Sequence, residues 1–269
     1  TPLDELRLRS VSGFVSVPST SGSGCDVSWS VLVRGDGGMP IEIASRELVP
    51  DWSLLDPALP ASMPASVTVD TGAEVVAHAF EALVSEWANP FSDLFAREAI
   101  TSVGSDLPKV VRRPEDVDLR MSIHHAATYA GLAASNAQLG AAHALAVGIG
   151  PETEVPYGRL LGTVLPYVAE FDYPSARERL ERASGVLGAS AGKDRSAVAE
   201  RFRAIFRPLG LPRTLQEAGV PAEVLTTGKD RIVARARASS ATVANPRVAS
   251  AEEYGRLLAC AFDGVAVMF

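Results

Sequence analysis

The sequence predicts a mainly α protein, in which a large helical domain follows a small β region at the N-terminus. From residue 70 onward, apolar side chains recur at the spacing of an amphipathic helix. Residues 1–55 instead alternate apolar with small or polar side chains, a pattern typical of strands. Four prolines within residues 49–68 separate the two patterns and favour an extended connector. We therefore predict two domains, residues 1–56 and 57–269.

In the β region, residues 11–18 and 26–35 are expected to be strands, and residues 39–48 fit a third. The Ser/Gly segment at residues 19–24 follows the first strand as a loop. Backbone N–H groups in such a loop can bind a phosphate or a polar ring edge. The loop lacks both Walker and G-x-G-x-x-G spacing, so a flexible turn is the alternative interpretation.

The rest of the chain is predicted to form a succession of helices. The first begins at Asp70 or Thr71, and the last follows a capping box made by Ser250 and Glu253. A break is expected at residues 136–140, and Pro166 should kink the helix that contains it. The other predicted helices cover residues 90–105, 115–134, 141–147, 158–171, 175–187, 195–206, 212–218 and 221–238.

Composition excludes several classes of function. The net charge is −7 and no basic run occurs, so a nucleic-acid partner is not expected. Cys25 and Cys260 lie far apart and form no disulfide framework. The sequence shows no leader and no apolar run of about 18 residues, so we expect no membrane partner and a cytoplasmic protein.

The histidines are concentrated in two segments. The chain has four, and His78 lies in residues 71–82 while His124, His125 and His143 lie in residues 121–158. His124 and His125 are adjacent and face different directions, so at most one can join a cluster with the others.

Glu74 and His78 are four residues apart on one predicted helix, so both face the same side. They can be two metal ligands or an acid–base pair. Alternatively, Glu74 caps the helix in a capping box with Thr71, and His78 is a core residue. His143 would complete a three-ligand set that leaves one position open for water or substrate.

Several segments, in the right order, resemble the iron-containing (group III) alcohol dehydrogenase family of the dehydroquinate synthase-like superfamily. VPSTSGSGCDV is similar to that family's P-T-T-x-G-T-G-S-E-V loop, and TGAEVVAHAFEA to its T-G-x-D-A-x-x-H-A-x-E-A helix. LVPDWSLLDPALPASMP resembles its proline-rich connector. IHHAATYAGLAASNAQLGAAHALA resembles its H-H-A…N-x-x-x-G-x-x-H-A segment, and ANPR its N-P-R.

The resemblance implies a fold and a set of cofactors. Residues 1–56 would be a remnant of a nucleotide-binding β region, and residues 57–269 an all-helical domain for metal and substrate. A divalent metal, Fe or Zn, would act as a Lewis acid on the substrate oxygen while NAD(P) exchanges a hydride. Glu74, His78 and His143 match ligand positions. The nucleotide loop places Ser19, Thr20, Gly22 and Gly24 at the cofactor.

The sequence also departs from the family pattern. The segment that normally precedes the P-T-T loop, including a pyrophosphate-binding G-G-G-S loop, is missing. Glu74 stands where the family has an Asp ligand, and Tyr157 replaces the last ligand His of a P-H-G motif. Val147 replaces a further His. The loss of one imidazole predicts that a divalent ion binds more weakly. The alternative is that the protein holds no cofactor.

Three functions are consistent with these features. The first is an oxidoreductase acting on a small alcohol, aldehyde or ketone with metal and NAD(P). The second is a lyase, dehydratase, isomerase or cyclase of a carbonyl compound, in which Tyr157 donates a proton and His78 or His143 is the base. The third is a non-catalytic partner subunit. Uncovered sheet edges would favour a homodimer or a hetero-complex.

Overall fold

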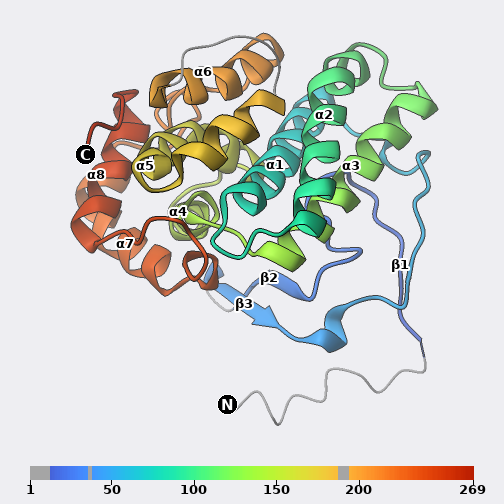
Figure 1. Cartoon of the computed structure of the whole chain (residues 1–269), viewed down its shortest axis with the longest axis horizontal. Coiled ribbons are helices and arrows are strands. Elements are labelled where there is room, and N and C mark those ends of the chain that lie inside the picture. The colour runs from blue at the N-terminus through green and yellow to red at the C-terminus, as the bar shows by residue number, and fades with distance from the viewer. Residues whose placement is uncertain (1–12, 36–37, 187–193) are drawn as a thin grey trace.

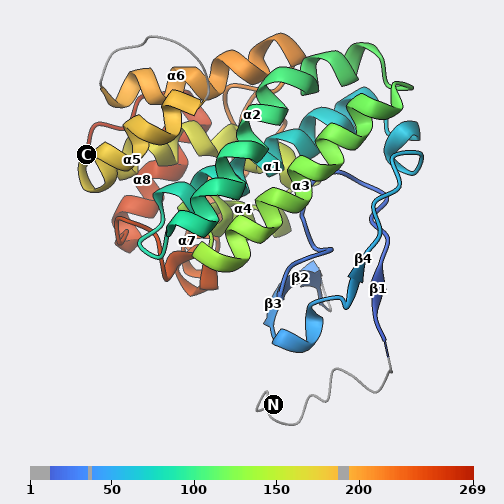
Figure 2. The ribbon, with the colours of Figure 1, turned by 45° about the vertical axis from the view of Figure 1, so that its right-hand side comes forward.

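The computed structural model describes residues 13–35, 38–186 and 194–269. It shows a body of packed helices with short strands along one side (Figure 1). Turning the molecule shows the strands projecting below α3, away from the helical body (Figure 2). The predicted mainly α fold is confirmed. Among the described helices, none combines the length and apolar character needed to cross a bilayer.

The strands form two separate pairs. β1 (Val15–Ser16) pairs in parallel with β4 (Trp52–Ser53), and β2 (Ser30–Arg34) pairs antiparallel with β3 (Pro40–Ala44). All are shorter than the predicted strands 11–18, 26–35 and 39–48, of which residues 11–12 lie outside the described part. The third ends early because the Ser45 hydroxyl accepts the backbone N–H of Glu47 and starts a 3-10 turn.

The proline-rich connector is more structured than predicted. It contains β4 and a 3-10 turn, Pro60–Ser62, and the first helix already begins at Ala65. The buried Arg120 side chain holds this segment in place. Its guanidinium donates to the carbonyl oxygens of Ala61 and Met63, both at 3.3 Å, and to the Thr68 hydroxyl at 3.0 Å. These contacts make the connector part of the helical body.

Three helices pack side by side at the centre of the fold: α1 (Ala65–Val84), α2 (Pro90–Arg112) and α3 (Val117–Ala137). The Asn89 side chain and Ser92 form a capping box at the start of α2. The predicted start of the first helix at Asp70 or Thr71 is wrong. The helix begins at Ala65, directly after Pro64. The missing N–H of a proline at a helix start costs nothing, because the first N–H groups have no partner within the helix.

The break predicted at residues 136–140 separates α3 from α4 (Ala141–Ile149). A 3-10 turn then leads to α5 (Tyr157–Val186), which contacts α1 along its length. Pro166 lies inside α5 without ending it, so a kink at Pro166 stays a prediction. The non-helical backbone of α5 occurs at Ala176, with φ −123° and ψ 26°, just beyond Pro174.

The last helices close the fold on the far side of α4 and α5. They are α6 (Arg195–Phe206), α7 (Lys229–Ala238) and α8 (Ala251–Asp263). The capping box between Ser250 and Glu253 is confirmed. The short helix predicted at residues 212–218 is a series of turns, and that predicted at 221–238 begins with a π-helical turn, Val224–Gly228.

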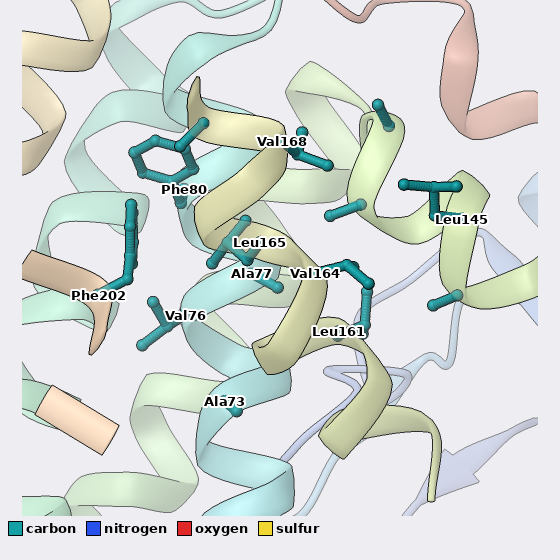
Figure 3. Packing of buried hydrophobic residues seen from close by; sticks show 14 of the residues in the cluster. Ala73, Val76, Ala77, Phe80, Leu145, Leu161, Val164, Leu165, Val168 and Phe202 are labelled. Atoms are coloured by element: carbon teal, nitrogen blue, oxygen red, sulfur yellow. The ribbon is translucent and has the colours of Figure 1, made fainter. Parts of the chain in front are cut away.

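The core is built around α1, which is buried on nearly every side. Figure 3 shows Phe80 of α1 against Phe202 of α6, with Leu165 of α5 beside them. The two phenyl rings meet edge to face, with centroids 4.4 Å apart. Small residues elsewhere on α1, such as Ala73 and Ala77, let α5 approach closely. This packing fixes the position of α1, which carries the candidate site residues.

The β region is fastened to the helices by a backbone contact between Gly24 and Gly131 of α3. A methyl group added to Gly131 would lie 2.5 Å from the Gly24 carbonyl oxygen and 2.8 Å from its Cα. Gly24 also has φ +62°, a conformation that side chains with a Cβ rarely adopt. No larger residue fits at either position without moving the loop.

We expect Gly131→Ala to lower the free energy of unfolding by about 1–3 kcal/mol, because overpacking pushes the loop from α3. Gly104→Ala is the matched control. A methyl group there meets nothing within 4 Å on α2, so it should stabilise by about 0.5–1 kcal/mol. Urea denaturation measures both values. Equal effects of the two substitutions would show that the contact does not constrain the loop.

Candidate active site

Glu74 and His78 lie on consecutive turns of α1, well inside the helix. Because α1 begins at Ala65, Thr71 cannot cap it. The Thr71 hydroxyl donates instead to the Val67 carbonyl oxygen at 2.9 Å. The capping-box interpretation of Glu74 is therefore wrong, and its carboxyl group is free to face the side on which His78 lies.

His78 is held as a neutral imidazole with a defined proton. Its Nδ1 lies 2.9 Å from the Glu74 backbone carbonyl oxygen, so Nδ1 carries the hydrogen and Nε2 keeps its lone pair. Burial, together with the nearby His143, lowers its pKa to about 3. The His78 ring meets the His143 ring nearly edge to face, with centroids 4.4 Å apart. At neutral pH this histidine accepts hydrogen bonds and carries no charge.

His143 lies in the first turn of α4 and is oriented by Glu81 of α1. The Glu81 carboxylate accepts the backbone N–H groups of Gly140 at 3.0 Å and Ala142 at 2.6 Å, and also bonds to His143 Nδ1. A carboxylate is acceptor-only, so Nδ1 carries the hydrogen. His143 Nε2 is buried with no hydrogen-bond partner. Its lone pair is therefore available to a ligand.

Asn245 completes the support of α4 from the other side. Its side-chain oxygen accepts the Ala141 N–H at 2.8 Å, and its amide nitrogen donates to Asp172 at 2.8 Å. Burial raises the pKa of Asp172 well above its usual range. Sequence reasoning missed the roles of Glu81 and Asn245. The signals that could have found them are the Glu in H-A-x-E-A and the Asn in N-P-R.

Tyr157 is the first residue of α5, and its ring lies beside that of His143. Its ring centroid is 6.3 Å from that of His143. Arg159 forms a bidentate ion pair with Asp70, at 3.0 and 3.1 Å, which fixes the start of α5 against α1. Burial and the carboxylates of Glu74 and Glu81 raise the pKa of Tyr157 well above its usual value. The phenol therefore stays protonated and can donate.

Glu74 has an unusual acidity for a carboxylic acid. Burial raises its pKa from 4.5 to about 7, although the nearby His143 works in the opposite direction. A methyl group at Gly22 would lie 3.0 Å from one Glu74 carboxyl oxygen, so the Ser/Gly loop covers this group. Glu74 can both hold and release a proton near neutral pH.

The remaining histidines lie away from this cluster. His124 is buried, and its Nδ1 is 2.8 Å from the Ser21 hydroxyl, which ties the Ser/Gly loop to α3. His125 is exposed and stacks on Tyr129, with ring centroids 6.1 Å apart. Neither joins His78 and His143. Val147 is buried within α4.

The predicted cofactor loop, residues 19–24, contributes in two ways. Gly22 packs against Thr71 and Glu74 of α1, and Gly24 packs against α3, so these glycines make room for protein atoms. Ser19 and Thr20 are exposed. Their hydroxyl groups, like that of the exposed Ser23, remain open to a nucleotide, and cofactor binding there stays a prediction.

The donors present do not fit a resident metal ion. Within the described ranges, no group of three or more His, Cys, Asp or Glu side chains is placed to hold one. The hydrogen bonds from His143 Nδ1 to Glu81 and from His78 Nδ1 to a carbonyl oxygen leave both Nε2 lone pairs free, as metal-ligating histidines require. The third donor, however, is the Glu74 carboxyl group, which burial keeps partly protonated near pH 7, and the nearby Tyr157 keeps its phenol proton. The set is therefore a weak one for a divalent ion.

Comparison with known proteins places these features in context. Residues 68–262 match the Fe-containing alcohol dehydrogenase family, C-terminal part. The NADPH-dependent butanol dehydrogenase of Clostridium saccharobutylicum is 29% identical over 100% of this chain and 70% of its own length. The 1-propanol dehydrogenase of Citrobacter freundii is 32% identical over 91% of this chain and 68% of its own.

Solved structures agree with these sequence matches. The iron-containing alcohol dehydrogenase of Thermococcus thioreducens superposes with a TM-score of 0.84 at 32% identity. The match covers 93% of this chain but 64% of that protein. This chain thus corresponds to the C-terminal domain of such proteins.

Replacing Glu81 should release the hydrogen of His143 from its fixed position on Nδ1. In Glu81→Gln, the amide N–H group faces the Ala142 N–H in one orientation, and the Gly140 N–H together with His143 Nδ1 in the other, so one backbone donor loses its acceptor either way. We expect ¹⁵N imidazole NMR spectra to show a mixture of His143 tautomers, with a loss of about 1–3 kcal/mol in unfolding free energy. Glu170→Gln, a buried carboxylate that instead accepts the Val267 N–H, should leave the tautomer unchanged. An unaltered His143 spectrum in Glu81→Gln would contradict the assignment.

The raised pKa of Glu74 predicts how stability depends on pH. The folded protein binds this proton up to about pH 7, whereas the unfolded chain releases it near 4.5, so this contribution is full below 4.5 and is lost as pH rises through 7. Glu74→Gln stays neutral. It should gain about 1–3 kcal/mol relative to the native protein between about pH 5 and pH 8. Urea denaturation across this range measures the difference. The exposed control Glu98→Gln should follow the native curve, and parallel curves for both variants would contradict the shift.

Proposed function

This chain belongs to the Fe-containing alcohol dehydrogenase family, and we propose on that basis that it binds and converts a small alcohol or its carbonyl counterpart in an NAD(P)-dependent oxidoreductase reaction. The named relatives act on short alcohols, and one is NADPH-dependent by name. Because the chain spans 64–70% of the relatives compared above, the reaction of the whole protein is part of the proposal.

The observation that supports the proposal best is the convergence of His78, His143 and Tyr157 from three different helices. The two imidazole rings are 4.4 Å apart, and the phenol ring is 6.3 Å from His143. Both histidines direct a lone pair on Nε2 away from their protein partners, and Tyr157 offers a hydroxyl hydrogen. An alcohol lying between them could donate its hydroxyl hydrogen to one Nε2 and accept the Tyr157 hydroxyl hydrogen, whereas a carbonyl oxygen would accept from Tyr157 alone.

This arrangement suits the proton half of the reaction. NAD(P), when bound, supplies or takes up the hydride. During reduction of a carbonyl compound, Tyr157 is the group placed to give a proton to the developing alkoxide, and the phenolate then takes up a proton from solvent. During alcohol oxidation, the lone pair on His143 Nε2 is placed to accept the hydroxyl proton. Glu74, with a pKa of about 7, can exchange that proton further.

A second candidate is an acid–base reaction without hydride transfer, such as isomerisation or dehydration of a carbonyl compound. The specific observation in its favour is that the described part of the chain assembles no group of three or more metal ligands, whereas groups able to donate and accept protons lie together. Tyr157 would donate to the carbonyl oxygen while His143 or His78 removes a proton from the neighbouring carbon.

Substitutions of Tyr157 test its role. Tyr157→Phe removes the donor, so NADPH-dependent reduction of a short aldehyde should slow by about 10²–10⁴-fold in kcat. Tyr129→Phe, at the surface of α3, is the control and should keep native activity.

Replacing Tyr157 with histidine tests metal binding. Tyr157→His exchanges the phenol for an imidazole, which can ligate a metal ion. We therefore expect this variant to bind Co²⁺ or Zn²⁺ more tightly than the native chain in a competitive dye titration.

Nucleotide binding separates the two candidates. Titration of the purified chain with NAD(P)H should show saturable binding if the oxidoreductase proposal is correct. A chain that binds no nucleotide but exchanges the α-hydrogens of an aldehyde for deuterium, with Tyr157→Phe inactive, would favour the acid–base reaction. Full activity of Tyr157→Phe in both assays would contradict both mechanisms.

A further inference from the structure

We propose that Ser135 and Gln138 form a polar subsite beside His78 that binds a second oxygen of the substrate. The preferred substrates would then be small vicinal diols and the matching hydroxy-aldehydes or hydroxy-ketones, instead of simple alkanols. The choice of substrate class rests on the oxidoreductase function proposed above, whereas the subsite itself does not.

A small cavity beside His78 provides the space. It has a volume of about 30 Å³, and its lining includes His78, Ser23, Trp29, Ser135 and Gln138. Such a volume holds about two water-sized groups. A hydroxymethyl or hydroxyethyl fragment has this size. Apart from the indole of Trp29, the side chains at this point are mostly small and polar, which suits an oxygen-bearing group.

Ser135 offers a hydroxyl group that no protein atom satisfies. Its Oγ is buried and has no hydrogen-bond partner. The backbone carbonyl oxygen of Ser135 accepts the Trp29 indole N–H at 2.8 Å, so the residue's position is fixed. A helical serine normally satisfies its hydroxyl on the preceding turn. A buried hydroxyl without a partner is unfavourable unless a ligand or water completes it.

Gln138 is held in a strained backbone conformation at the end of α3. With φ 69° and ψ 172°, it has the only positive φ among the non-glycine residues in the described ranges. This region of conformational space is essentially restricted to glycine. The Gln138 N–H still donates to the Ala134 carbonyl oxygen at 2.7 Å, so α3 ends there in a defined way. Glycine would fill the position without strain.

The amide group of Gln138 can explain why this position holds a glutamine instead of a glycine. No hydrogen bond in the described part of the chain involves its amide group, and the residue lines the cavity. An amide can donate to and accept from the same hydroxyl or carbonyl oxygen. Together with the Ser135 hydroxyl, it can satisfy one substrate oxygen fully.

The position of the cavity determines which oxygen it receives. His78 forms part of its wall, and the His78 ring contacts that of His143, next to Tyr157. A substrate whose reacting oxygen lies between these rings would extend its neighbouring carbon past His78. An oxygen on that carbon then falls at Ser135 and Gln138. In a simple alkanol, an apolar methyl group would occupy the cavity and leave both polar side chains unsatisfied.

Substrate discrimination tests the subsite. The full chain would be assayed for kcat/KM with propane-1,2-diol and 1-propanol. We expect Gln138→Leu and Ser135→Ala each to lower the diol-to-alkanol ratio of kcat/KM by about tenfold or more, because each removes a hydrogen bond that only the diol makes. Gln216→Leu, an exposed glutamine in the turns before α7, is the matched control and should keep the native ratio.

Gln138→Gly separates strain from chemistry. It removes the amide and also permits the observed φ without strain, so the melting temperature should rise while the diol-to-alkanol ratio falls as in Gln138→Leu. A purely structural glutamine would change stability without changing the ratio. An unchanged ratio in Gln138→Leu, Gln138→Gly and Ser135→Ala overturns the subsite, whatever their stability.

Ligand binding distinguishes failure of the subsite from failure of the proposed reaction. If the native chain turns over neither compound, the oxidoreductase proposal is wrong, and saturation-transfer NMR with the same two compounds decides the subsite. A propane-1,2-diol signal that exceeds that of 1-propanol and disappears in Gln138→Leu supports it. Absence of the diol signal in the native chain, or an equal signal in Gln138→Leu, overturns it.

Discussion

The buried carboxylate of Glu81 is the group on which the candidate active site depends. It joins α1 to the start of α4 by accepting two backbone N–H groups and the Nδ1–H of His143. A carboxylate so deeply buried is costly unless each lone pair is used. Here the free N–H groups and the positive end of the helix dipole provide that compensation. The position of α4 and the proton on His143 are therefore fixed by the same contact.

The residues around this contact show where the chain departs from ordinary packing. Glu74 is a buried acid with a pKa of about 7, Ser135 has a buried hydroxyl without a partner, and Gln138 occupies a glycine conformation. Elsewhere, side chains cap the N-termini of α2, α3, α6 and α8, and the core is filled by Ala, Val, Leu and Phe. Local rules that fail together at one place usually indicate a functional site, since the fold must stabilise them elsewhere.

Much of the helical fold could be predicted because apolar periodicity reports directly on which face of a helix is buried. The capping box at Ser250 could also be predicted, since its pattern needs only four consecutive residues. The start of α1 was missed because Arg120, distant in sequence, holds the proline-rich segment against it. Glu74 and His78 could be paired by spacing, but Glu81, Ser135 and Gln138 required knowledge of where α3, α4 and the strands meet. Such contacts between distant residues have no periodic signal.

The exchange of an imidazole for a phenol at Tyr157 changes what the cleft can hold. An imidazole offers a neutral lone pair to a cation, whereas a buried phenol with a raised pKa offers a hydrogen. Glu74 is also less suited to a metal ion, because a carboxyl group that is protonated up to about pH 7 is a weaker ligand. Burial raises both pKa values, because it disfavours the charged forms of Glu74 and Tyr157. His78 and His143 keep a basic lone pair on Nε2, whereas Tyr157 and Glu74 can carry a proton, so proton transfer is the chemistry to which these four side chains together are suited.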